Sequence, residues 1–119
     1  MNMELQIIIH SLEVDISAQA REDNIRAFVI WIFKTNVGDI KIKGGTIRRK
    51  EFGSKSLLSY EPPSIKGRQG KYNRTFFMDD KQLYLKLCAY TIKRYCEESG
   101  ESVQDFSHYE EVNPDDIPF

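Results

Sequence analysis

The sequence predicts an α+β fold, in which a small antiparallel sheet of about five strands is followed by one long C-terminal helix and a disordered acidic tail. Three observations predict it. Apolar residues alternate over the first part of the chain, whereas between Leu83 and Ile92 they recur at helical spacing. From Glu101 onward the chain is polar and acidic with two prolines. In a chain of 119 residues we therefore expect one domain, residues 1–100, and a tail, residues 101–119.

The first three strands are predicted from apolar alternation. The first is expected from Glu4 to Ile16, where β-branched residues are frequent and neither glycine nor proline occurs. The second, from Ile25 to Phe33, is apolar on both faces, which is typical of a central strand covered twice. Since a single helix can cover one face only, this pattern predicts a homodimer. The third runs from Ile40 to Ile47, and Gly44-Gly45 predicts a bulge or sharp bend in it.

The remaining strands are short. Residues 57–60 form an apolar piece that ends at Pro62-Pro63, because proline is not tolerated in a central strand. Residues 64–71 (SIKGRQGK) have the glycine content and charge of a mobile loop. Alternation over residues 72–78 predicts the last strand.

The helix is predicted between a capping pair, Asp79-Asp80, and a stop at Gly100. Cys88 and Cys96 both lie on it, about 12 Å apart at 1.5 Å per residue, which is too far for a disulfide. We expect reduced thiols in a cytoplasmic protein. The scattered histidines and cysteines match no zinc spacing, so neither a metal nor another cofactor is expected.

The formal net charge of −1 conceals a strong asymmetry. Residues 1–95 hold all 17 Lys and Arg and 10 Asp and Glu, a net +7, whereas residues 96–119 hold eight Asp and Glu and no Lys or Arg. Such a division indicates a basic body that meets a polyanion and an acidic tail that meets something else. It also predicts that, without ligand, residues 101–119 lie across the basic face as a brake.

The basic charge is concentrated between Ile40 and Arg74, where aromatic residues are interleaved with it. Lysine and arginine attract any polyanion, whereas an exposed ring can stack on an unpaired base. The combination favours single-stranded DNA or RNA over duplex. Trp31 lies in the most apolar stretch and is expected in the core, as are Phe76 and Phe77 in their strand. The residues predicted to bind nucleic acid are Lys41, Lys43, Arg48, Arg49, Lys50, Lys55, Tyr60, Lys66, Arg68, Lys71, Tyr72 and Arg74.

Tyr60 and Tyr72 are the members of this set that we expect to stack on bases, with Phe52 as a third ring. The arginines and lysines would neutralise phosphates. A solvated charged face over core aromatics is the plainer interpretation, but the glycines of residues 64–71 would let the backbone approach a phosphate closely.

The chain ends in Asp115, Asp116, Ile117, Pro118 and Phe119. A terminal ring beside its free carboxylate and two aspartates suits a partner pocket rimmed by Arg or Lys. This DDIPF sequence resembles the conserved C-terminal tip of bacterial single-stranded DNA-binding proteins. The resemblance implies that these five residues recruit replication, recombination and repair proteins. It does not extend to the body, because a standard OB-fold has a helix between its third and fourth strands, whereas here the helix follows all strands.

The body carries four motifs in a recognisable order. RAFVIWIF is followed by VGDIKIKGG, by PPSIKGRQGKYNRTFF and by a helix that begins near DDKQLYLKL. This order is similar to the septation protein SpoVG family (stage V sporulation protein G), over roughly residues 5–95. The resemblance implies a small antiparallel sheet with a packed helix, a dimer, and nucleic-acid binding near the basic loop. After Tyr72 the chain departs from the family pattern.

Together these features predict a single-stranded DNA-binding protein that protects unpaired DNA and recruits DNA-processing proteins through its tip. The alternative is a SpoVG-like regulator that binds duplex DNA or RNA selectively. An enzyme is not expected, because Asp79-Asp80 is explained as a helix cap and neither His10 nor His108 has an evident partner. The longest apolar run, residues 27–33, is too short to span a bilayer, so we expect a cytoplasmic, nucleoid-associated protein of a bacterium, phage or plasmid with no membrane partner.

Overall fold

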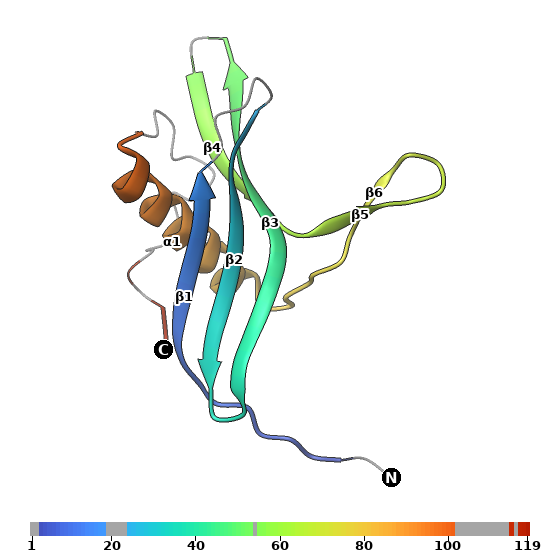
Figure 1. Ribbon diagram of the computed structural model, residues 1–119, viewed down its shortest axis with the longest axis vertical. Coiled ribbons are helices and arrows are strands. Elements are labelled where there is room, and N and C mark those ends of the chain that lie inside the picture. Colours follow the sequence, from blue (N-terminus) through green and yellow to red (C-terminus); the bar gives the residue numbers. More distant parts are fainter. Residues whose placement is uncertain (1–2, 19–23, 54, 102–114, 116) are drawn as a thin grey trace.

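The computed structural model describes residues 3–18, 24–53, 55–101, 115 and 117–119. These residues form a curved antiparallel sheet, a small projecting hairpin and one helix, which is the α+β arrangement that the sequence predicts (Figure 1). The main sheet holds four strands in chain order: β1 (Ile9–Ala18), β2 (Ile25–Thr35), β3 (Gly38–Phe52) and β4 (Lys55–Glu61). A two-stranded sheet and the helix follow: β5 (Ser64–Lys66), β6 (Tyr72–Arg74) and α1 (Lys81–Ser99).

Two strands are shorter than predicted, each because its neighbour ends. The first begins at Ile9 rather than Glu4, since Ile9 pairs with Thr35, the last residue of β2, and the chain before it has no strand opposite. The predicted strand over residues 72–78 stops at Arg74, which pairs with Ser64 directly after the two prolines. Residues 64–71, expected as a mobile loop, contribute β5 to this hairpin.

A β-bulge bends β3 at the predicted glycine pair. Opposite Val29–Trp31 of β2, β3 carries one additional residue, because the register shifts between Ile42 and Gly45. Gly44 has a φ of +96°, which other residues rarely adopt. Gly45 is buried, and a Cβ there would lie 2.6 Å from Cε2 of Tyr60. The bulge is therefore confirmed, and it leaves room for the ring of Tyr60 against the backbone of β3.

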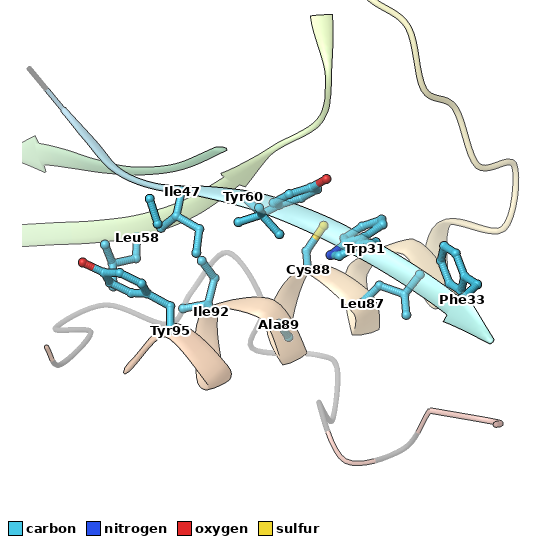
Figure 2. Packing of buried hydrophobic residues seen from close by; sticks show 12 residues of the cluster. Trp31, Phe33, Ile47, Leu58, Tyr60, Leu87, Cys88, Ala89, Ile92 and Tyr95 are labelled. Atoms are coloured by element: carbon cyan, nitrogen blue, oxygen red, sulfur yellow. The ribbon is translucent and has the colours of Figure 1, made fainter. Parts of the chain in front are cut away.

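Trp31 lies at the centre of the core, between β2 and α1 (Figure 2). It is fully buried, and its ring stacks on that of Tyr60 with the centroids 4.5 Å apart. Its Nε1 donates a hydrogen bond of 2.8 Å to Oγ1 of Thr91 on α1. Around this pair, α1 packs Leu87 and Ile92 against the sheet. The predicted core position of Trp31 is confirmed.

Both ends of α1 lie where the capping residues predict them. Asp80 Oδ1 accepts a hydrogen bond of 3.1 Å from the backbone N–H of Leu83, and Gly100, in the left-handed conformation, donates its N–H to the carbonyl of Cys96. Within the described ranges, no helix is long and apolar enough to cross a membrane.

The second face of β2 is apolar, as predicted, and lies opposite α1. Strand alternation places Phe28, Ile30 and Ile32 there, and Phe28 is 36% exposed. Among the described residues, α1 covers the other face only. The homodimer expected from this pattern stays a prediction.

Candidate nucleic-acid interface

A groove of about 840 Å³ lies on the sheet face opposite α1, where the β5–β6 hairpin leaves the body. Its wall combines cations, aromatic rings and a single carboxylate, contributed by β2, β3, the end of β4 and the hairpin. The lining side chains that bear on its chemistry are Phe28, Arg48, Lys50, Glu61, Tyr72 and Arg74.

β3 supplies the cations of the groove floor. Because successive strand residues point to opposite faces, Arg48 and Lys50 share the face of Phe28, whereas Ile47 and Arg49 face α1. Lys50 forms an ion pair of 2.9 Å with Glu61 on the neighbouring strand, which partly balances its charge. Arg48 is therefore the main cationic contribution of β3 to the groove.

The hairpin supplies a ring and a second guanidinium. Tyr72 is 69% exposed and pairs with Lys66 across the hairpin. Arg74 lies with its guanidinium carbon 5.0 Å from the ring centre of Tyr84 and 5.4 Å from that of Phe77, and its Nε donates to the carbonyl of Phe76. These contacts hold the Arg74 guanidinium beside Tyr84 of α1, so Arg74 lines the groove from its edge.

Two predicted binding residues are not in the groove, and their assignments are corrected. Arg49 points to the α1 side, where its side chain is 13% exposed, donates to Oγ of Ser56 and lies 3.7 Å from Oε1 of Glu101. Tyr60 is 4% exposed and stacked on Trp31, and burial raises the pKa of its hydroxyl. Both side chains lie on the α1 side of the sheet, away from the groove.

The other predicted cations are exposed but lie outside the groove wall. They are carried by the far half of β3 and by the hairpin with its turn: Lys41, Lys43, Lys66, Arg68 and Lys71. The side chains of Lys55 and Phe52 fall outside the described residues. Of the two phenylalanines expected in the core, Phe76 packs edge-on against Trp31, whereas Phe77 is 71% exposed.

Phe28 is the groove residue that sequence reasoning missed. Its membership of a doubly apolar strand indicated a covered position, yet it lines the groove beside Arg48. A signal for it was available in the sequence. Phe28 lies near the start of β2, and because β2 and β3 are antiparallel, the start of β2 lies beside the basic C-terminal half of β3.

Burial disfavours the thiolate form of both cysteines. Cys88 is buried, and burial raises the pKa of its thiol to about 12; burial raises the pKa of Cys96 as well. A thiol with so high a pKa stays protonated and unreactive at neutral pH. Among the residues that the structure describes, no three His, Cys, Asp or Glu side chains gather closely enough to hold a metal ion.

The predicted partner-binding tip lies against the body. Asp115 pairs with Lys93 on α1, and Ile117 and Phe119 pack against the core. Residue 116 and the stretch 102–114 fall outside the described residues, as does most of the predicted disordered tail. The tail was predicted to lie across the basic segment, residues 40–74. The tip does not do so, because its partner Lys93 lies outside that segment. Of the described tail residues, Glu101 contacts the basic segment, through Arg49.

No protein-family model, curated protein or solved structure matches this chain. The chemistry of the groove and of the chain's end is therefore the basis for a functional proposal. The groove pairs guanidinium groups with exposed rings on an open surface, and the tip pairs an aromatic ring with carboxylates.

Proposed function

We propose that this protein binds single-stranded nucleic acid, DNA in the first place, in the groove between the sheet and the β5–β6 hairpin. The observation that carries the proposal is the meeting of Arg48 and Arg74 with the rings of Tyr72 and Phe28 in one groove. Guanidinium groups neutralise phosphates, and rings stack on unpaired bases. A duplex offers phosphates but no free base faces, so the aromatic part of the groove adds affinity for single strands only.

The exposed cations extend this surface beyond the groove. β3 continues past Gly44 to Lys43 and Lys41, and the projecting hairpin carries Lys66, Arg68 and Lys71 (Figure 1). A strand held in the groove would meet further positive charge on either side. Such contacts position the backbone without reading sequence.

Oligo(dT) is expected to bind at least about fivefold more tightly than a duplex of equal length, since one stacked base is worth about 1 to 3 kcal/mol. The measurement is a fluorescence-polarisation titration of both ligands over a salt series. The affinity should fall with salt by a logarithmic slope of about 0.7 for each phosphate neutralised on the single strand. Equal affinity for the two ligands would favour the duplex-binding regulator instead, and a flat salt dependence would exclude phosphate contacts.

We propose further that the C-terminal tip recruits replication, recombination and repair proteins once it is presented to them. Phe119 offers a ring and a terminal carboxylate, Pro118 restricts the backbone before it, and Asp115 adds charge. These groups fit an apolar pocket rimmed by arginine or lysine.

Removal of Phe119 is expected to abolish binding of a synthetic peptide, residues 110–119, to a purified bacterial exonuclease or helicase that binds the intact peptide. The ring and its carboxylate fill the pocket, so the shortened peptide keeps only the acidic residues. Surface plasmon resonance measures the difference, with Asn113→Ala as the control peptide. If the shortened peptide binds as well as the control, Phe119 does not carry recruitment.

A further inference from the structure

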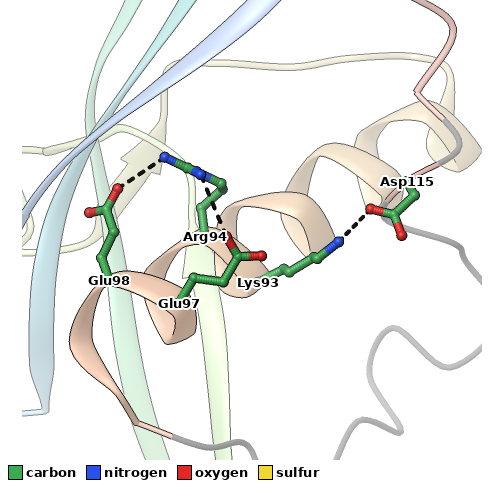
Figure 3. Close-up of polar contacts among 5 residues, drawn as sticks. All are labelled: Lys93, Arg94, Glu97, Glu98 and Asp115. Carbon is green, nitrogen blue, oxygen red and sulfur yellow. Dashed lines mark hydrogen bonds and ion pairs between the residues drawn. The ribbon is translucent and has the colours of Figure 1, made fainter.

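The tip is held at a defined place on the body, away from the groove. Asp115 Oδ1 lies 2.5 Å from Nζ of Lys93, on the exposed side of α1 (Figure 3). Phe33, which the tip also contacts, shares the α1-facing side of β2 with Trp31, whereas Phe28 of the groove points to the opposite side. The sheet therefore separates the tip from the groove.

An apolar contact accompanies this ion pair. The ring of Phe119 meets that of Phe33 edge to face, with the centroids 6.2 Å apart and the planes inclined by 69°, an arrangement that aromatic pairs prefer. Ile117 is half-buried and also packs against the core. Since Phe33 itself is only 6% exposed, the tip completes the cover over this end of the core.

Two neighbouring cations of α1, Lys93 and Arg94, have different partners. Arg94 forms ion pairs with Glu97 and Glu98 on its own helix, whereas Lys93 pairs with Asp115, 22 residues further along the chain (Figure 3). The hydrogen bond to Asp115 raises the pKa of Lys93. An exposed ion pair stabilises little by itself, so the apolar contact provides most of the affinity and the ion pair fixes the orientation of the peptide.

The first residue of the tail is also held on α1. The hydroxyl of Tyr95 donates a hydrogen bond of 2.5 Å to Oε2 of Glu101, whose other oxygen lies 3.9 Å from Nε of Arg26. Two described residues of the tail, Glu101 and Asp115, thus contact side chains of α1.

We propose that Phe33 and Lys93 form a binding site for an acidic peptide ending in Pro-Phe, and that its occupant is the tip of the same chain. The site itself stands on the contacts above. Its consequence rests on the proposed function: a docked tip is closed to other proteins, and their apparent affinity falls by the fraction of molecules in which the tip is free. Because the sheet separates the two sites, nucleic acid in the groove does not compete with the docked tip.

Nuclear magnetic resonance on the full, isotope-labelled chain tests this site. In the wild type we expect nuclear Overhauser effects between the rings of Phe33 and Phe119, and order parameters above about 0.6 for the amides of Ile117 and Phe119. Lys93→Glu should lower these order parameters, because attraction becomes repulsion. Asp115→Lys in the Lys93→Glu background should restore them. Lys81→Glu, an exposed charge reversal at the start of the same helix, is the matched control and should change nothing.

Three results would overturn the proposal. The first is the absence of contacts between the two rings in the wild type, and the second is an equal response to Lys93→Glu and Lys81→Glu. The third is a mixture of differently labelled chains that shows the ring contacts only between copies, since the occupant would then be a second molecule. The resonance measurement contains no nucleic acid and no partner protein. A negative result would therefore not affect the proposal that the groove binds single strands, and a negative oligo(dT) titration would not affect the proposal that the tip is docked.

Discussion

Replacing Trp31 with alanine is expected to lower the free energy of unfolding by about 3 to 5 kcal/mol, the usual cost of removing a large aromatic side chain from a core. The side chain is fully buried and joins the sheet to α1, stacking on Tyr60 and bonding to Thr91. A small domain is stable by about 5 to 15 kcal/mol in all, so much of its stability depends on this one residue. Urea unfolding followed by circular dichroism measures the loss, because Trp31 is the chain's single tryptophan and its fluorescence disappears with it.

Trp31→Phe separates the packing of the ring from its hydrogen bond. The Thr91 hydroxyl still donates to the carbonyl of Leu87 at 2.7 Å, so no buried polar group loses its last partner. The expected loss is therefore smaller, by about 2 kcal/mol, than that of the alanine variant. Tyr90→Ala, on the less buried side of α1, should cost less than either. A cost for Trp31→Ala no greater than for Tyr90→Ala would contradict the central place of Trp31.

Features set by local chemistry could be predicted from the sequence. The caps of α1 follow from the side chain of Asp80 and the conformational freedom of Gly100, and neither depends on distant residues. The bulge at Gly44 follows from glycine in the same way. The start of β1 could not be predicted, because it depends on where β2 ends rather than on the apolar residues before Ile9.

The two faces of β3 illustrate a second limit. Alternation dictates that Arg48 and Arg49 point to opposite sides, but a slip of one residue exchanges them, and the bulge introduces such a slip. Without it, a register counted from the β2–β3 turn would place Gly45 opposite Phe28, whereas the structure places Thr46 there. The composition of the basic segment is therefore enough to propose a ligand class, whereas the choice between Arg48 and Arg49 requires the register.

Tyr72→Ala combined with Arg48→Ala is expected to weaken oligo(dT) binding by at least about tenfold. Loss of one stacked base alone costs about 1 to 3 kcal/mol, and Tyr72 is the most exposed ring that lines the groove. Loss of one phosphate contact should also lower the logarithmic salt slope by about 0.7. Fluorescence polarisation over the same salt series measures both quantities, and duplex affinity should change less, because a duplex uses the phosphate contact only.

The matched control is Arg49→Ala combined with Tyr90→Ala, which removes the same two side-chain types from positions outside the groove. Arg49 neighbours Arg48 in sequence but points toward α1, where it meets Ser56 and Glu101. Its removal should lower stability and leave oligo(dT) affinity and the salt slope unchanged, whereas the groove variant should do the reverse. If both double variants weaken binding equally, the affinity comes from net charge alone. The groove would then have no part in recognition, since a ligand that responds to total charge cannot distinguish the two faces of β3.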